Sequence, residues 1–168
     1  MVKVGILNVT GYAGVELARI IATHPEAELV SVTGRSEAGK KLAEVFPHLS
    51  QYDMTIESEI TKSIDVVFSA LPHKASAEAC QYYYEQGIKV IDISADFRLK
   101  DLSVYESWYD VTHPCPQHIE DAVYGLPELH KTEIKAADLI ANPGCYPTSA
   151  ILALAPAIKA GIIEDDII

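Results

Sequence analysis

The sequence predicts an α/β protein with a Rossmann-like, doubly wound parallel sheet. Three observations lead to this fold class. The chain opens with an apolar run, a glycine-containing turn and a helical pattern within residues 2–21. Apolar runs of strand length then alternate with helical patterns along residues 28–33, 64–70, 75–85, 89–94 and 137–141. Polar or turn-forming residues follow the apolar runs, at the strand ends where parallel sheets bind their ligands.

Residues 1–21 form a strand, turn and helix suited to a dinucleotide. Residues 2–7 are apolar and rich in valine and isoleucine, and a helical pattern begins near Val15. A glycine at position 11 lets the backbone approach a pyrophosphate, and one at position 14 lets the helix pack close to the strand. Asn8 replaces the first glycine usual in such turns, but asparagine tolerates the left-handed conformation. A purely structural turn gives the same pattern; as a cofactor site, it would contact the dinucleotide through Thr10, Gly11, Tyr12, Ala13 and Gly14.

The end of the second strand indicates which dinucleotide is bound. Residues 28–33 alternate in polarity as a strand does, and Arg35 and Ser36 follow. An acidic residue at this distance from the glycines typically binds the ribose hydroxyl of NAD. A guanidinium and a hydroxyl instead suit a ribose 2′-phosphate, so we expect NADP. The alternative is a solvated surface arginine, and Glu37 would repel the phosphate unless its side chain turns away.

The next two strands supply further candidate cofactor contacts. Residues 64–70 are expected to form a strand that stops at Leu71 and Pro72, and residues 89–94 a strand that ends at Ser94. A helix over residues 75–85, closed by Gly87, connects them. Residues 97–131 show little periodicity but contain Trp108 and other aromatic residues. We therefore expect a long ordered loop there rather than disorder.

Cys145 is the candidate nucleophile. It lies on a tight turn of sequence Asn-Pro-Gly-Cys, just before an apolar run of helical pattern at residues 149–160. Unpaired backbone N–H groups and the positive end of a helix dipole favour a thiolate at such a place. The alternative is a buried structural cysteine beside a helix cap. Cys80, on the helix expected at residues 75–85, is predicted to be such a buried residue.

Composition excludes several classes of function. The chain has 168 residues, enough for one domain with a core, and a net charge of −11 that argues against binding nucleic acid or anionic membranes. No apolar stretch approaches the ~20 residues of a membrane span, and no secretory signal is recognisable. The three cysteines show no framework spacing. We therefore expect reduced thiols and a cytoplasmic location.

Five segments together resemble the N-acetyl-γ-glutamyl-phosphate reductase family, NADPH-dependent enzymes of arginine biosynthesis. They are TGYAGVEL at 10–17, SALPH at 69–73, DISADFRL at 92–99, YGLPE at 124–128 and ANPGCYPT at 141–148. The resemblance implies that the thiolate of Cys145 attacks an acyl phosphate, that phosphate leaves, and that NADPH reduces the resulting thioester to N-acetyl-glutamate 5-semialdehyde. The guanidinium of Arg98 is suited to hold a substrate carboxylate or phosphate through two hydrogen bonds, and Asn142 is a second candidate substrate contact. An ion pair of Arg98 with Asp96 or Asp101 is the alternative for that residue.

The resemblance also sets the expected domain organisation. Residues 1–150 correspond to the NADP-binding domain and end in the nucleophile turn, and residues 151–168 to a helix and the start of a second domain. Family members continue with a substrate and oligomerisation domain that carries the catalytic histidine. We therefore expect this chain to be a fragment that is inactive alone, from a protein that forms a homo-oligomer.

Three other functions remain open at this level. The first is a related acyl-phosphate reductase, acting like aspartate-semialdehyde dehydrogenase or on carrier-bound aminoadipate. The second is an NADP-binding module without catalysis. The third is a metal site at His113, Cys115 and His118, which lacks a fourth ligand and is disfavoured. No metal is expected. His73, at a strand end, either lines the nicotinamide side or is an ordinary turn histidine, which is favoured.

Overall fold

The computed structural model describes residues 1–163, which form a six-stranded, wholly parallel sheet of order β2-β1-β3-β4-β6-β5. The expected doubly wound α/β fold is confirmed. The strands are β1 (Val2–Leu7), β2 (Ala27–Val32), β3 (Val66–Ser69), β4 (Lys89–Asp92), β5 (Val123–Tyr124) and β6 (Leu139–Ala141). All but β5 were expected. Strands β3 and β6 begin two residues later than predicted, and β4 ends two residues earlier, because the paired residues span only these shorter ranges.

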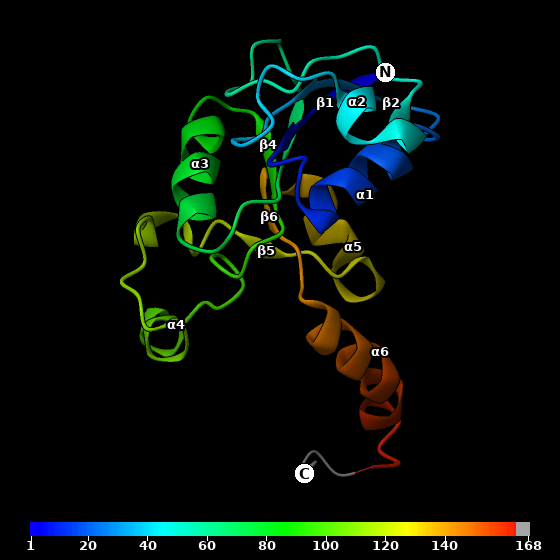
Figure 1. The fold of residues 1–168 in the computed structure, drawn as a ribbon. Helices are drawn as coiled ribbons and strands as arrows, with labels where there is room; N and C mark the ends of the chain where they lie inside the picture. Colours follow the sequence, from blue (N-terminus) through cyan, green and yellow to red (C-terminus); the bar gives the residue numbers. More distant parts are fainter. Residues whose placement is uncertain (164–168) are drawn as a thin grey trace.

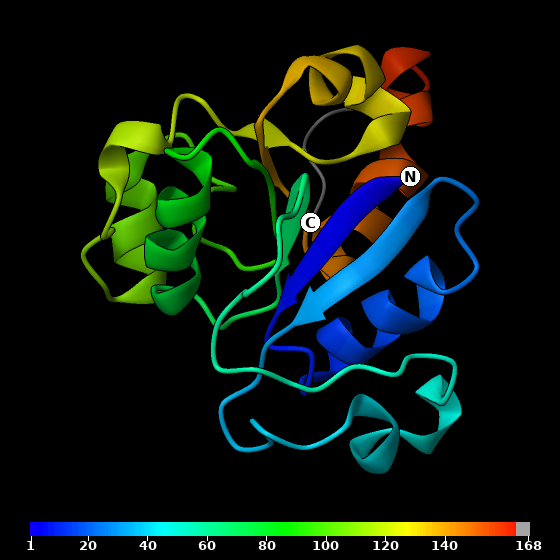
Figure 2. The ribbon, with the colours of Figure 1, turned by 90° about the horizontal axis from the view of Figure 1, so that it is seen from above.

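Helices cover both faces of the sheet, as strands rich in valine, isoleucine and leucine require. Helix α1 (Tyr12–Ile21) and helix α5 (Pro127–Ala136) lie on one side, and helix α3 (Ala75–Tyr84) lies on the other (Figure 1). The view from above shows the same division (Figure 2). The core accordingly has two parts. One cluster, around Val67, Val90 and Cys80, packs under α3, and the other, around Ile6, Val32 and Ala18, packs under α1.

The stretch predicted as a long loop is more regular than expected. Residues 97–131 contain helix α4 (Leu102–Tyr109), a 3₁₀ turn at Pro116–His118, strand β5 and the start of α5. Helix α4 shows no apolar periodicity because it buries only Tyr105. Its start is set instead by Asp101, whose carboxylate accepts the N–H groups of Ser103 at 2.8 Å and Val104 at 3.2 Å. A short helix, α2 (Leu42–Val45), and a 3₁₀ turn at Pro47–Leu49 were also not predicted.

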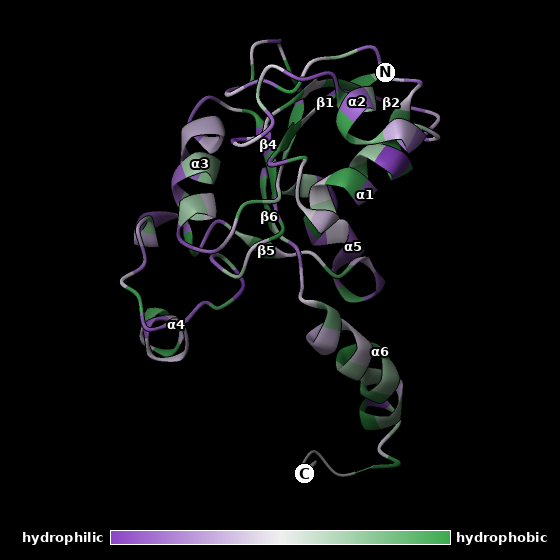
Figure 3. Cartoon of the chain, in the orientation of Figure 1, coloured by the Kyte–Doolittle hydropathy of each residue, from purple (hydrophilic) through white to green (hydrophobic). Residues whose placement is uncertain are grey.

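Helix α6 (Cys145–Lys159) projects away from the body of the molecule (Figure 1). It begins four residues earlier than the apolar pattern predicted, because Gly144 takes the N-cap position and Pro147 is tolerated in a first turn. The helix is largely apolar (Figure 3), yet none of its residues is buried. The proposed domain boundary at residue 150 lies within this helix and stays a prediction. Part of the expected start of a second domain, residues 164–168, lies outside the described residues. Among the described residues, no helix has the length and apolar character needed to cross a bilayer.

Candidate functional site

The turn between β1 and α1 is built by Asn8 and Gly14. Asn8 has a φ of 63°, the left-handed conformation expected when asparagine replaces glycine. Its side-chain N–H donates to the Ala70 carbonyl at 2.9 Å, which ties the turn to the end of β3. A Cβ at Gly14 would lie 2.3 Å from the Asn8 carbonyl oxygen and 2.7 Å from the Val9 Cα. Gly14 was predicted to let the helix pack close to the strand, and the structure shows this close approach at the two residues that follow β1.

A cavity of about 850 Å³ opens beside this turn. Its volume is within the range of pockets for small molecules and cofactors. Among the predicted cofactor residues, those that line it are Thr10, Arg35, Ser36, Leu71 and Pro72. The sheet thus brings together the ends of β1, β2 and β3, as the topology required. Glu37, which could have repelled a phosphate, instead pairs with Lys40, with Nζ 2.6 Å from Oε2.

The remaining predicted cofactor residues do not line this cavity. Gly11, Tyr12, Ala13 and Gly14 form the start of α1 beside it, where Tyr12 is 97% exposed. The first backbone N–H groups of a helix have no partner within the helix, and at the start of α1 no side chain caps them either. Ser94 is buried, and its hydroxyl donates to the Asp92 carboxylate at 2.8 Å. Whether these residues contact a cofactor stays a prediction.

Sequence reasoning missed the second wall of the cavity. Residues 58–60 and 62–64 line it, together with Ala79, Tyr82 and Tyr83 of α3 and with Gln86, which follows that helix. The segment is held at the end of β2 by a bridge between Thr33 and Glu57, where the Gly34 N–H donates to the Glu57 carbonyl at 3.0 Å. This pairing spans 24 residues and joins short polar stretches. No local motif could therefore have predicted it.

Cys145 is the accessible thiol. It is exposed as the first residue of α6, directly after Gly144, which offers no side chain to cap the helix. Cys80 and Cys115 are buried. Burial raises the pKa of the Cys80 thiol well above its usual value and that of Cys115 to about 11. Both buried thiols are thus held in the neutral form, as expected for Cys80.

Arg98 supports the turn that carries Cys145. Its Nε donates to the Asn142 carbonyl at 2.8 Å and its Nη2 to the Ile93 carbonyl at 2.7 Å. Nη1 lies 3.1 Å from the position that a Cβ at Gly144 would take. The alternative of an ion pair with Asp96 or Asp101 is wrong for the described residues. The side-chain amide of Asn142 donates to the Pro143 carbonyl at 3.1 Å.

Two buried carboxylates lie behind this turn. Asp92 accepts from the Ser76 hydroxyl at 2.5 Å and from the Ser94 N–H and hydroxyl at 3.0 and 2.8 Å. Burial raises its pKa above the usual range for aspartate, because no cation among the described residues offsets the lost hydration. Asp96 accepts from two backbone N–H groups and from Tyr105. Neither role was predicted from the sequence.

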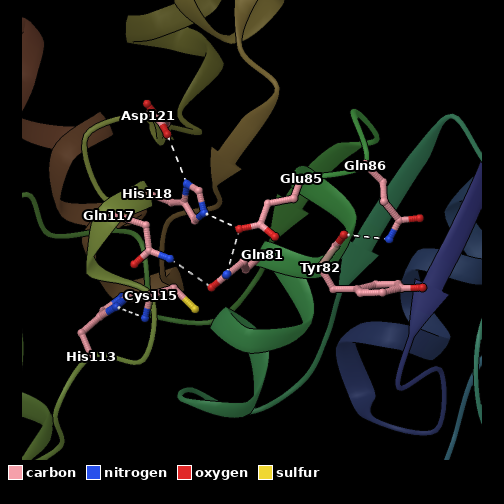
Figure 4. Close-up of polar contacts among 9 residues, drawn as sticks. All are labelled: Gln81, Tyr82, Glu85, Gln86, His113, Cys115, Gln117, His118 and Asp121. Carbon is pink, nitrogen blue, oxygen red and sulfur yellow. Dashed lines mark hydrogen bonds and ion pairs between the residues drawn. The ribbon is translucent and has the colours of Figure 1, made fainter.

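The histidines of the disfavoured metal site serve other purposes (Figure 4). His113 accepts the Cys115 N–H through Nδ1 at 3.0 Å, and its Nε2 lies 2.8 Å from the Asp96 carbonyl. His118 lies between Glu85 and Asp121, at 3.4 and 3.3 Å. Within residues 1–163, no three side chains of the ligand types are grouped to hold a metal. His73 is exposed beside the ring of Tyr109, with centroids 5.7 Å apart.

The fold and the cavity define a dinucleotide-binding domain, and comparison with known proteins agrees. Residues 3–137 match the family described as semialdehyde dehydrogenase, NAD binding domain. The chain belongs to this family. Cys145 lies just beyond the matched residues, so the match by itself assigns it no role.

Longer proteins resemble nearly the whole chain. A protein of Dehalococcoides mccartyi named N-acetyl-gamma-glutamyl-phosphate reductase is 59% identical over 162 residues, which cover 96% of this chain and 48% of that protein. One of the same name from Pelotomaculum thermopropionicum is 53% identical, over 97% of this chain and 48% of its own length. The chain thus spans about half the length of these relatives.

Solved structures share the fold at low sequence identity. Aspartate semialdehyde dehydrogenase from Candida albicans, determined with NADP, superposes with a TM-score of 0.68 at 19% identity, over 95% of this chain and 47% of its own. Aspartate semialdehyde dehydrogenase from Francisella tularensis superposes with a TM-score of 0.65 at 20% identity, over 96% of this chain and 42% of its own. These likenesses concern the fold alone.

Proposed function

We propose that this chain is the cofactor-binding and nucleophile-bearing part of an NADPH-dependent N-acetyl-γ-glutamyl-phosphate reductase. The observation that carries the proposal is the Cys145 turn. An exposed thiol begins α6, just after the end of β6, at the same edge of the sheet as the cavity. The names of the relatives that match nearly the whole chain support the substrate.

The residues of the cavity fit a phosphorylated dinucleotide. The tight contact at Gly14 and the uncapped start of α1 suit a pyrophosphate, which backbone N–H groups and the helix dipole stabilise. Arg35 and Ser36 offer a guanidinium and a hydroxyl at the end of β2, the groups that favour a 2′-phosphate. Because Glu37 is paired with Lys40, the local negative charge is partly neutralised. These features support NADP over NAD.

In the proposed reaction, the Cys145 thiolate attacks the acyl carbon of N-acetylglutamyl phosphate. The C–O bond to phosphate breaks, inorganic phosphate leaves, and a thioester to Cys145 remains. Bound NADPH would supply the hydride that reduces this acyl group to the aldehyde. The N–H groups at the start of α6 stabilise negative charge on sulfur when the thiolate forms and when it is released.

Arg98 and Asn142 are proposed to contact the substrate from the same turn. Two nitrogens of Arg98 are used by carbonyl groups, and the third, Nη1, has no acceptor among the described residues. A fixed guanidinium with an available N–H is suited to an anionic oxygen. The proton transfers need a further group, which we propose lies in the half of the relatives' length that this chain does not span. We also propose a cytoplasmic homo-oligomer for the whole protein.

The test is to trap the acyl group on Cys145. The chain is mixed with N-acetylglutamyl phosphate without NADPH, quenched in acid and analysed by mass spectrometry. A mass increase of one N-acetylglutamyl group on the peptide containing Cys145, absent from Cys145→Ser, is expected. Aspartyl phosphate serves as the competitor substrate. Equal labelling by both would place substrate selection outside this chain, and labelling of Cys80 or Cys115 in place of Cys145 would refute the proposal.

A further inference from the structure

Asp96 is a buried carboxylate with an unusual set of partners. Its side chain is fully shielded from solvent, although it lies in the loop after β4. Oδ1 accepts the Lys74 N–H at 2.8 Å and the Tyr105 hydroxyl at 2.7 Å, and Oδ2 accepts the Ala77 N–H at 2.8 Å. Its main-chain carbonyl lies 2.8 Å from Nε2 of His113. Asp96 therefore joins α3, α4 and the segment around residue 113.

The two N–H groups that Asp96 accepts belong to the start of α3. The residue at the N-cap of that helix, Lys74, has a φ of 71° and makes no side-chain cap bond. A side chain that accepts from the first turn usually comes from the N-cap residue itself. Here a carboxylate from 22 residues further along the chain takes that role. Its negative charge also lies at the positive end of the helix dipole.

Asp96 connects two parts of the candidate site. In one direction it fixes α3, whose residues Ala75, Ala79 and Tyr82 line the cavity. In the other direction its loop continues to Arg98, which holds the Asn142 carbonyl beside the Cys145 turn. The Asn142 N–H in turn donates to the Asp92 carbonyl at 2.8 Å. The short loop that carries Asp96 and Arg98 thus contacts both α3, which lines the cavity, and the turn that carries Cys145.

We propose that Asp96 is a positioning residue, which caps α3 from outside the helix and thereby sets the cavity wall relative to the Cys145 turn. This inference rests on the proposed function, which assigns the cofactor to the cavity and the nucleophile to the Cys145 turn. Hydride transfer requires donor and acceptor carbons in a narrow range of geometry, so a rigid link between cavity and thiol serves that reaction. Nothing in this role requires Asp96 to contact a substrate.

The test compares Asp96→Asn with Asp101→Asn by hydrogen exchange. At position 96 the amide oxygen can replace Oδ1, but the NH₂ group faces the Ala77 N–H, so the charge and one cap bond are lost. Asp101 also caps a helix, and asparagine retains that function. Asp96→Asn should accelerate exchange of the Lys74, Ala77 and Asn142 amides by at least about threefold, a typical effect of weakening a cap. Amides of β1 report any global loss of stability.

A second readout is the dissociation constant for NADP⁺, expected to rise by at least about threefold in Asp96→Asn and not in Asp101→Asn. If Asp96→Asn does not fold, Tyr105→Phe replaces it in the test. That variant removes one hydrogen-bond donor to Asp96 and keeps the aspartate charge, so the same amides should exchange faster, by a smaller factor. Combining Asp96→Asn with Arg98→Lys should change Asn142 exchange by less than the sum of the two single effects, because both act on one loop.

Two results would overturn the inference. The first is acceleration confined to Lys74 and Ala77, which would make Asp96 a local helix cap only. The second is an equal effect of Asp101→Asn on Asn142. A wild-type chain that fails to bind NADP⁺ would instead count against the proposed function, and Asn142 exchange would still decide the role of Asp96.

Discussion

Cys145 differs from the other cysteines chiefly in its exposure to solvent. We expect iodoacetamide to modify it at least about tenfold faster than Cys80 or Cys115 at neutral pH, because burial keeps those two thiols neutral and inaccessible. Mass spectrometry of each cysteine peptide over time gives the three rates. Cys145→Ser should leave only slow labelling. Faster labelling of Cys80 or Cys115 in the folded chain would contradict the assignment.

Arg35 is the residue expected to distinguish the two dinucleotides. Replacing it with alanine should weaken NADP⁺ binding by about 1.5–3 kcal/mol, the value of hydrogen bonds to a charged group, and leave NAD⁺ binding nearly unchanged. Calorimetric titration of both cofactors measures this. Arg19→Ala is the control, because Arg19 pairs with Glu16 on α1, away from the cavity. A wild-type chain with equal affinity for both cofactors would disprove the preference.

The raised pKa of Asp92 predicts how the stability of the fold depends on pH. Burial raises its pKa in the folded state, so its protonated form stabilises the fold below the unfolded pKa of about 3.9, and this contribution is lost as the pH rises through the folded pKa. Asparagine does not ionise. Asp92→Asn should therefore gain stability relative to the wild type as the pH increases from about 4 to neutrality. Urea unfolding at several pH values measures the difference.

Asp101 provides the control with the opposite sign. Hydrogen bonds from Ser103 and Val104 lower its pKa, so its contribution is present above the unfolded pKa and lost as the pH falls. Asp101→Asn should lose stability relative to the wild type as the pH rises from strongly acidic values. The same trend in both variants would show that the environment of Asp92 differs from that described.

At the scale of elements, the stability of the β1–turn–α1 unit depends more on Gly14 than on Gly11. A Cβ at Gly14 would meet backbone atoms of Asn8 and Val9. A Cβ at Gly11 would instead meet the Asn8 side chain, at 3.2 Å. Gly11 also has a φ of −80°, which any residue can adopt. Gly14→Ala should thus destabilise the chain by at least about 2–3 kcal/mol, as overpacking against backbone does. Gly11→Ala should cost less than about 1 kcal/mol.

Denaturant unfolding of the two variants tests this difference, with cofactor binding measured alongside. Gly11→Ala serves as the matched control, because it adds the same methyl group three residues earlier in the turn. Similar stabilities for the two variants would mean that the turn can shift away from the helix. The dependence on Gly14 follows from the short distance between helix and turn, and not from a positive φ.

At the scale of the whole molecule, α6 is the helix that projects away from the sheet and the helices packed on it. Leu152 and Ile158 are 36% and 43% exposed on a helix with no buried residue. We expect concentration-dependent self-association, because exposed apolar side chains favour burial against another chain. The net charge of −11 opposes association, so added salt should strengthen it by screening. Sedimentation velocity over a wide concentration range measures the effect.

The double variant Leu152→Gln and Ile158→Gln should weaken this association. Leu129→Gln is the control, because Leu129 is 49% exposed on α5. If the wild-type chain remains monomeric at all concentrations and salts, the surface of α6 does not act as an apolar contact. A loss of association in the control alone would place the contact on α5.

Most of the sheet and the conformation of the turns after β1 and β6 followed from local sequence. A buried parallel strand is an apolar run, and a phosphate turn needs glycines or asparagine at fixed positions, so β1, β2, α1, Asn8 and Gly14 were predictable. The expected identity of Cys145 as the accessible thiol also rested on neighbours within the same turn. These features depend on backbone constraints that act over a few residues.

Only the tertiary structure decided which distant groups meet. Asp96 accepts from the start of α3, Arg98 from its loop holds the Asn142 carbonyl, and residues 58–64 form a cavity wall. A hydrogen bond between such groups depends on the position of the chain in space, and any aspartate or arginine has many possible partners in the sequence. The sequence by itself determined the fold and the conformation of the turn between β1 and α1. The packing of loops over the strand ends decided how cavity and thiol are joined.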